Sequence, residues 1–197
     1  MKQSQTEETR LGREFFMTDA VTLARKLLGK VLVHETKDGP IRAVITETES
    51  YMGAEDKASH AYGGRRTNRT ETMFHVGGTS YVYLIYGMYC CMNVVANEEE
   101  IPHAVLIRKV EPADEVSKQR MLARRSVKKE KNLADGPGKL CIAMDITREL
   151  DDIDLVTSRE FYLTEGRKVP EKNIKCGKRI NIDYAEEAVD FLWRFYI

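Results

Sequence analysis

The sequence lacks the features that define several large classes of protein. No apolar run approaches the ~20 residues that a membrane-spanning helix needs. The first residues, MKQSQTEETR, are polar and partly acidic, unlike a signal or transit peptide. There is no internal repeat and no low-complexity segment. We therefore expect a protein that does not span a membrane and that is cytoplasmic by default.

Cysteine and histidine are few and scattered. The four cysteines form no Cys-x-x-Cys pair, and the adjacent Cys90 and Cys91 would point to opposite faces of a strand. The four histidines include no pair at i, i+4 spacing on a helix. Buried free thiols are therefore favoured over a zinc site or a disulfide. We expect neither a metal nor any other cofactor.

The net charge is zero, so the protein as a whole has no field that favours nucleic acid. Local charge is segregated, because residues 118–131 and 167–179 are strongly basic while acidic residues gather elsewhere. Such segregation is compatible with a surface that faces phosphates, and equally with a solvated charged face. The pattern leaves both interpretations open.

The length of 197 residues is enough for one compact domain and short for two. We expect disorder over residues 1–10 and a single domain, monomeric by default, over 11–197. Hydrophobic spacing and turn residues predict strands at 30–34, 41–49, 80–86, 89–95 and 104–110, with more short strands in the C-terminal third. Helices are predicted at 19–28, 114–131 and 140–146. Without a regular βαβ alternation, the fold class is α+β.

A polar loop follows the second predicted strand. Residues 51–69 are rich in Gly, Arg, Asp and Asn, and predict a long loop with one short helix near 55–60. Loops of this length inside a compact domain tend to be functional. At its mouth, Ile45, Glu47, Glu49 and Tyr51 alternate onto one face of the strand. This face is either a solvated edge or a catalytic surface on which Glu49 serves as a general base.

Tyrosines cluster in the segment from Ser80 to Tyr89. Tyr81 and Tyr83 share one face of the predicted strand, whereas Tyr86 lies on the other face, at the hairpin turn. They are either core tyrosines with partners for their hydroxyl groups or rings that stack on nucleobases.

These segments resemble the alkyladenine (3-methyladenine) DNA glycosylase family over residues 11–197. The resemblance rests on Glu47-Thr-Glu-Ser-Tyr51, Gly63-Gly64-Arg65, Tyr81-Val-Tyr-Leu-Ile-Tyr-Gly-Met-Tyr89 with Met92-Asn93, and Leu106-Ile-Arg108. It continues through Gly136-Pro137, Lys139-Leu140-Cys141 and Arg194-Phe195-Tyr196. It implies a curved, mainly antiparallel sheet with a protruding aromatic hairpin and a few surrounding helices.

The resemblance also implies an activity. The protein would be a monofunctional glycosylase of base excision repair that binds duplex DNA without cofactor or obligate protein partner. Its substrates would be purines of the 3-methyladenine, 7-methylguanine, hypoxanthine and etheno-adenine class. Glu49 would activate the hydrolytic water, which Arg108 and the backbone carbonyl of Ile180 would hold. The alternative is a nucleic-acid-binding module without catalysis.

The resemblance assigns the other site residues to binding. Tyr51 on one side, and His60 with Tyr83 on the other, would sandwich the flipped base. Asn93 would exclude guanine, and Tyr86 would fill the gap left in the duplex. Contacts with the DNA backbone or flanking bases would come from Arg65, Thr67, Arg69 and Met73.

One departure from the family pattern concerns the water-binding segment. The family commonly has Arg-Val-Gly-Val where this chain has Arg179-Ile180-Asn181-Ile182. Asparagine tolerates left-handed backbone angles better than most residues other than glycine. We therefore expect the local conformation to survive the change.

Overall fold

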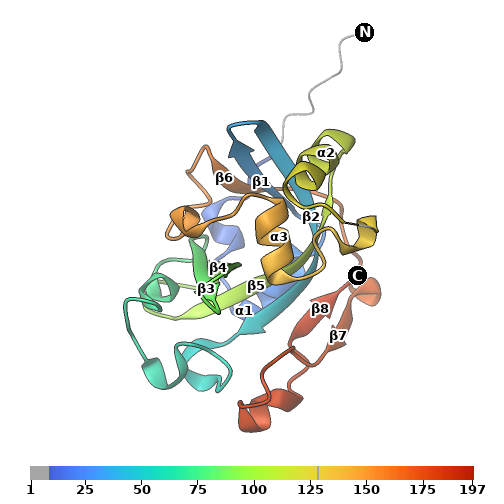
Figure 1. The fold of residues 1–197 in the computed structure, drawn as a ribbon. Coiled ribbons are helices and arrows are strands. Elements are labelled where there is room, and N and C mark those ends of the chain that lie inside the picture. The colour runs from blue at the N-terminus through green and yellow to red at the C-terminus, as the bar shows by residue number, and fades with distance from the viewer. Residues whose placement is uncertain (1–8, 128) are drawn as a thin grey trace.

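A long strand, β2 (Gly39–Tyr51), runs through a curled antiparallel sheet in the computed structural model, which describes residues 9–127 and 129–197 (Figure 1). β1 (Val31–Thr36) precedes it through a tight turn at Lys37 and Asp38. The strand order is β3-β4-β5-β2-β1-β6, and all of these pairs are antiparallel. The other strands are β3 (Ser80–Ile85), β4 (Tyr89–Ala96), β5 (His103–Pro112) and β6 (Phe161–Thr164).

The C-terminal strands complete the surroundings of β2. β8 (Arg194–Tyr196) pairs with Glu47–Glu49 of β2, and β7 (Lys175–Gly177) pairs with β8. The same stretch of β2 pairs with β5 along its other edge. This half of β2 is therefore flanked on both sides, and the interpretation of Glu49 as part of a solvated edge is wrong.

Three α-helices accompany the sheet in the described residues: α1 (Ala20–Leu27), α2 (Glu115–Arg124) and α3 (Pro137–Ala143). α1 and α3 lie on opposite faces of the sheet, and α2 lies at one end (Figure 1). Leu23 and Leu27 of α1 and Leu140 of α3 are fully buried in the main hydrophobic core. The α+β prediction is confirmed.

α1 forms where its sequence signals predict. The Asp19 carboxylate accepts a hydrogen bond from the Thr22 N–H at 2.9 Å, as an N-cap residue does. Ala20, Leu23, Ala24 and Leu27 recur on one face, and that face is buried.

Several predicted boundaries need correction. The helix predicted for 114–131 ends at Arg124, where Arg125 becomes extended and its guanidinium binds the carbonyls of Asn132 and Leu133. The helix predicted for 140–146 begins at Pro137, which suits a first helical turn, and ends at Ala143.

The short helix predicted near 55–60 is replaced by 3₁₀ turns at Gly53–Glu55 and Tyr62–Gly64. The Asp56 carboxylate accepts hydrogen bonds from the Met52 and Ala58 N–H groups, which competes with helix formation.

At the N-terminus, residues 1–8 of the predicted disordered segment lie outside the described residues. Its last two residues, Thr9 and Arg10, instead join the edge of the sheet. Arg10 forms a bridge with Thr164, and the Thr9 carbonyl accepts a hydrogen bond from the Glu165 N–H. None of the helices in the described ranges is long and apolar enough to cross a membrane.

The capping role of Asp19 at the start of α1 can be tested by mutation. Replacing Asp19 by alanine removes the acceptor for the Thr22 N–H, so we expect the free energy of unfolding to fall by about 1 kcal/mol. Urea denaturation measures it. The control Asp19→Asn keeps a side-chain acceptor and should lose less; equal losses in the two variants would contradict the capping role.

Candidate active site

A row of paired residues crosses the concave part of the sheet. Glu49 of β2 is opposite Leu106 of β5, Leu106 is opposite Asn93 of β4, and Asn93 is opposite Tyr81 of β3. Directly paired residues project from the same face of a sheet, so the four side chains lie side by side. Positions 49, 81, 93 and 106, far apart in the sequence, are thereby brought to one surface.

Irregularities in the sheet adjust this surface. The register between β2 and β5 shifts between Ile45 and Glu47 and again between Glu47 and Thr48. Ile45, predicted on the same face, lies instead in the main hydrophobic core because the register shifts after it, whereas Glu47 and Glu49 both approach Arg108. Bulges of this kind re-aim side chains and are frequent next to active sites.

Glu49 is completely buried, and three groups hold its carboxylate. Oε1 accepts the Ile180 N–H at 2.8 Å, and Oε2 accepts the Tyr51 hydroxyl at 2.9 Å. The Arg108 Nη1 lies 3.3 Å from Oε2. Burial raises the pKa of Glu49, while Arg108, the Ile180 N–H and the Tyr51 hydroxyl act in the opposite direction.

Arg108 joins the two carboxylates of β2. Its Nε donates to Glu47 Oε1 at 3.1 Å while its Nη1 faces Glu49. Arg194 of β8 also donates to Glu47 Oε1, at 3.1 Å. Glu47 therefore holds the guanidinium of Arg108 in place beside Glu49.

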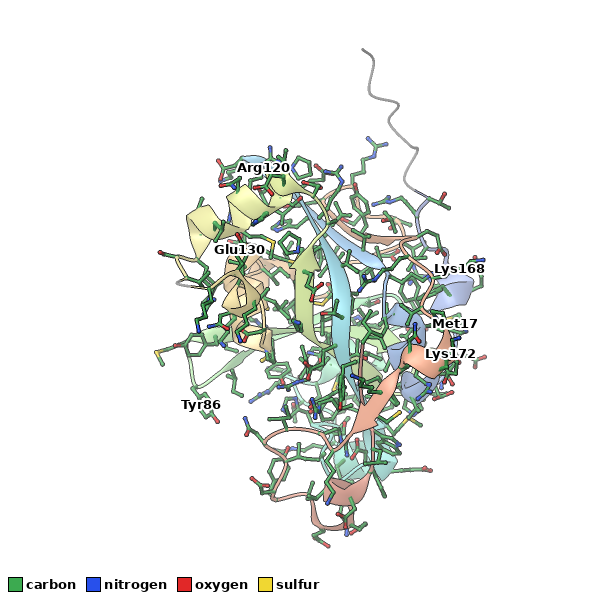
Figure 2. The ribbon with its side chains drawn as sticks, turned by 90° about the vertical axis from the view of Figure 1, so that its right-hand side faces the viewer. Met17, Tyr86, Arg120, Glu130, Lys168 and Lys172 are labelled. Carbon is green, nitrogen blue, oxygen red and sulfur yellow. The ribbon has the colours of Figure 1, made fainter. Side chains whose placement is uncertain are left out.

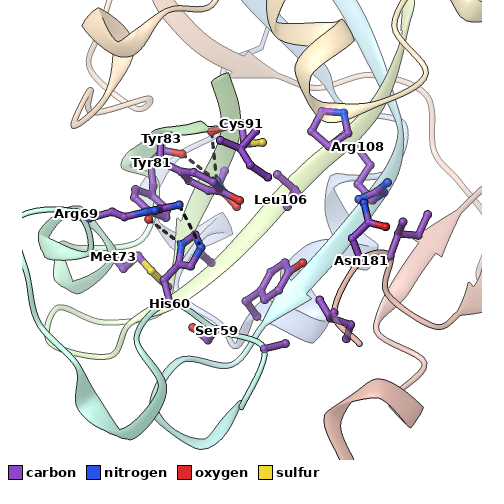
Figure 3. Close-up of a pocket in the computed structure, with 18 of the residues that line it drawn as sticks. Ser59, His60, Arg69, Met73, Tyr81, Tyr83, Cys91, Leu106, Arg108 and Asn181 are labelled. Carbon is purple, nitrogen blue, oxygen red and sulfur yellow. Dashed lines mark hydrogen bonds between the residues drawn. The ribbon is translucent and has the colours of Figure 1, made fainter. Parts of the chain in front are cut away.

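A cavity of about 280 Å³ opens in front of this row. Figure 3 shows His60, Tyr81 and Tyr83 on one side of it, and Arg108 and Asn181 on the other. The predicted pocket residues Tyr51, His60, Tyr83 and Asn93 line it together, as do Arg108 and Ile180. Glu49 lies behind this lining, in contact with Tyr51, Arg108 and Ile180.

His60 is held against the tyrosine wall. Its Nδ1 lies 3.0 Å from the Tyr81 hydroxyl, and its ring centroid lies 4.7 Å from that of Tyr83, edge to face. Burial and the nearby Arg69 and Arg65 lower the pKa of His60 to about 4. The imidazole is thus neutral at physiological pH, and it adds no charge to the cavity.

Asn93 and Met73 are both buried at the cavity wall. The Asn93 Nδ2 donates to the Tyr81 carbonyl at 3.0 Å, which fixes the orientation of its amide. Met73 is 2% exposed and belongs to an apolar cluster with Phe74 and Tyr81. Its side chain therefore lines the pocket and offers almost no surface for the DNA contact predicted from the resemblance.

Tyr86 projects from the tip of the β3–β4 hairpin (Figure 2). It is 80% exposed, and both Tyr86 and Gly87 have positive φ angles, 52° and 69°. A left-handed conformation is rare for a bulky residue and costs on the order of 1 kcal/mol. The turn thus holds a large aromatic side chain out in solvent beside the cavity that it also lines.

The predicted DNA contacts of the 51–69 loop are exposed. Arg65, Thr67 and Arg69 lie on the surface and, with His60, line a hollow that adjoins the cavity. Arg69 also lies over the Tyr83 ring, 5.0 Å from its centroid.

Ile180 contributes to the site in a way that the sequence did not predict. Its backbone N–H binds Glu49, whereas the resemblance assigns a role to its carbonyl. The next residue, Asn181, has a φ of 60°, the left-handed conformation that glycine would adopt at low cost. Asparagine thus accommodates the backbone where the family commonly has glycine.

Sequence reasoning missed the pair formed by Asp56 and Arg179. Both side chains are fully buried and joined by two bonds of 2.5 and 2.9 Å. Arg179 also donates to the Ser50 carbonyl at 2.9 Å. The pair fastens the segment before Ile180 to the end of β2. Charged residues are almost never buried without a partner, but the sequence does not reveal which positions are buried.

Apart from Arg179 at the end of the second stretch, the described residues of the two basic stretches do not mark the site. On α2 and the loop after it, Lys118 pairs with Glu130 at 2.8 Å and Arg124 with Asp38 at 2.8 Å. Arg120 lies at one end of the molecule, and Lys168 and Lys172 lie on the side opposite Tyr86 (Figure 2). At these positions the structure favours the interpretation of a solvated charged face. In the part of the chain described, no cluster of His, Cys, Asp and Glu could hold a metal ion.

A small pocket walled by aromatic side chains is typical of enzymes that act on a base taken out of its stack. Comparison with known proteins identifies the family. The chain belongs to the methylpurine-DNA glycosylase (MPG) family, whose sequence model matches residues 14–197. The family resemblance is thereby confirmed, and with it the class of enzyme, a DNA glycosylase.

Similar proteins of clostridia carry the name "Putative 3-methyladenine DNA glycosylase". The chain is 48% identical to one from Clostridium perfringens (strain SM101 / Type A) over 195 residues, which cover 95% of each chain. It is 48% identical to one from Clostridium acetobutylicum over 197 residues, with 95% of this chain and 94% of the relative covered. It is 47% identical to one from Clostridioides difficile (strain 630), with 94% and 98% covered.

The buried ion pair predicts a large effect on stability. Asp56→Ala leaves the Arg179 guanidinium buried without its carboxylate, so we expect the free energy of unfolding to fall by about 3–5 kcal/mol. Chemical denaturation gives the value. The matched control is Glu187→Ala, which breaks an exposed pair with Lys57 and should lower the free energy of unfolding far less. Similar losses in both variants would contradict this account.

Proposed function

We propose that this protein is a monofunctional DNA glycosylase that extrudes a damaged purine and hydrolyses its N-glycosidic bond. The observation that carries the proposal is the Glu49 carboxylate, held by Tyr51, Arg108 and Ile180 behind the aromatic cavity. The names of the relatives agree with such an activity. The proposed substrates are the 3-methyladenine, 7-methylguanine, hypoxanthine and etheno-adenine class.

The cavity suits one extruded base. Its volume of about 280 Å³ lies just below the range of ~300–1,000 Å³ typical of drug-sized ligands. The rings of Tyr51, His60 and Tyr83 offer stacking surfaces. The amide of Asn93, oriented by the Tyr81 carbonyl, lines the cavity, and its proposed role is to exclude guanine by a clash with the exocyclic amino group. Because unstacking a base costs a few kcal/mol, the exposed ring of Tyr86 would offset part of that cost by filling the gap.

The reaction requires a water beside Glu49. The carboxylate is fully buried, so Tyr51 or Arg108 must shift when the base enters for a water to reach Oε2. The carboxylate would then accept the proton of the attacking water and stabilise the positive charge that develops on the sugar. The proton ends on Glu49, and the bond between the sugar and the base nitrogen breaks as the oxygen–sugar bond forms. The electron pair of the broken bond stays on the base nitrogen, so a cationic alkylated purine leaves as a neutral base.

Other features agree with a monofunctional enzyme. A Schiff-base mechanism with strand cleavage needs an amine nucleophile, and none of the described residues that line the cavity is a lysine. The hydrolysis as proposed uses only water and the residues of one chain. We therefore propose a monomer that acts on duplex DNA, with residues 11–197 as the glycosylase domain and Arg65, Thr67 and Arg69 as DNA contacts.

Substitution of the carboxylate tests the activity. The wild-type protein is incubated with duplexes that carry each lesion, and abasic sites are scored; we expect base release. Glu49→Gln keeps the shape of the side chain but removes the carboxylate that serves as general base. The rate at which the damaged purine is released should therefore fall by about 10²–10⁴-fold. Binding of the lesion duplex should remain within a few-fold of wild type. A wild-type protein that binds but releases no base would favour the non-catalytic binding module.

The pH dependence of release tests which group is the base. Because burial raises the pKa of Glu49 above its usual 4.5, the rate should fall as the pH drops toward that raised value and the carboxylate becomes protonated. His60, with a pKa of about 4, remains neutral over this range. His60→Gln should therefore change the rate without moving the acid limb. Single-turnover rates on a cationic lesion between pH 5 and 9 measure both profiles, and an acid limb that disappears in His60→Gln would contradict the assignment.

A further inference from the structure

Arg179 lies directly behind one wall of the pocket. Its guanidinium is 4.9 Å from the centroid of the Tyr51 ring and 5.0 Å from that of Trp193. Tyr51 lines the cavity, whereas the side chain of Arg179 is fully buried and lies outside the lining. The Tyr51 ring therefore separates a permanent cation from the space that a base would occupy.

The cation cannot easily move away from the ring. Asp56 binds both Nη atoms of Arg179, and the carbonyls of Ser50 and Ala188 accept further hydrogen bonds from them. Asp56 is itself fixed by the Met52 N–H at 3.1 Å. Arg69, which lies over the Tyr83 ring, is not fixed in this way. It is exposed and lines the cavity, where an incoming base can displace it.

A cation on one face of an aromatic ring alters the other face. The attraction arises from the negative face of the ring quadrupole, and it strengthens when the cation is desolvated, as Arg179 is. Asp56 cancels the net charge of the pair, but the guanidinium is the member that lies over the ring. It therefore draws the π-electron density of Tyr51 toward itself and makes the near end of the pair positive. The ring face toward the cavity thus attracts a cationic base less strongly than an unperturbed tyrosine would. The binding of a neutral base is weakened only slightly.

We propose that Arg179, held by Asp56, is a specificity-determining residue that acts through the Tyr51 ring. It lowers the preference of the pocket for positively charged bases over neutral bases of the same shape. The inference rests on the proposed function and deepens it. It names a residue that sets the relative affinity of the site for cationic alkylated purines and neutral damaged purines.

The test compares two lesions that differ in charge but hardly in shape. One duplex carries 3-methyladenine, which is cationic while attached to the sugar, and the other carries its neutral isostere 3-methyl-3-deazaadenine. All proteins carry Glu49→Gln, so that the base is not released during the measurement. The readout is the ratio of the two dissociation constants, neutral over cationic, obtained by fluorescence anisotropy.

The variant Asp56→Asn/Arg179→Gln removes both charges and leaves groups that can still form hydrogen bonds. We expect the ratio to rise about 3- to 10-fold in favour of the cationic lesion. The control Lys118→Gln/Glu130→Gln neutralises an exposed pair at the α2 surface and should leave the ratio unchanged. With Tyr51→Leu as background there is no ring to transmit the effect, so neutralising the Asp56–Arg179 pair should leave the ratio unchanged.

Other outcomes would overturn the inference. If both affinities fall by the same factor, the pair supports only the structure of the site, and the specificity role is wrong. If the Glu49→Gln parent binds neither lesion more tightly than undamaged duplex, the proposed function itself fails. Circular dichroism checks folding. Should Asp56→Asn/Arg179→Gln not fold, Asp56→Leu/Arg179→Met replaces the buried pair with apolar side chains, which proteins often tolerate, and the same shift is expected.

Discussion

The site depends on keeping a carboxylate in a place that water does not reach. Removing a carboxylate from water costs several kcal/mol, so Glu49 must be stabilised by donors that replace its hydration. The three donors come from three distant segments: Tyr51 at the end of β2, Arg108 in β5 and Ile180 after β7. The carboxylate is held by all three donors only when these segments are folded against one another.

Much of the surrounding architecture brings those segments together. β8 closes the edge of β2 next to Glu47 and Glu49, and the register shift in β5 directs Arg108 toward both carboxylates. The Asp56–Arg179 pair then ties the start of the polar loop to the residue before Ile180. The same ion pair thus supports the aromatic wall, the donor to Glu49 and the path of the C-terminal segment.

Prediction from the sequence succeeded where the signal is local. The helix predicted at 19–28 can be read directly, as can the hairpin that carries Tyr86. It failed where side-chain hydrogen bonds that the hydrophobic spacing does not reveal decide the conformation. Residues 55–60 are not helical because Asp56 binds nearby N–H groups and Arg179, and α2 ends early where Arg125 turns to the carbonyls of Asn132 and Leu133.

The sequence by itself determined the family, the α+β class, the alternation that places Glu49 and Tyr51 on one face, and the clustering of tyrosines in one hairpin. Only the tertiary structure decided that Glu49 is buried, that the Ile180 N–H donates to its carboxylate, and that Arg179 lies behind Tyr51. The physical reason is the range of the interactions. Strand alternation and capping act between neighbours in the chain, whereas burial of charge depends on segments more than a hundred residues apart, as for Asp56 and Arg179.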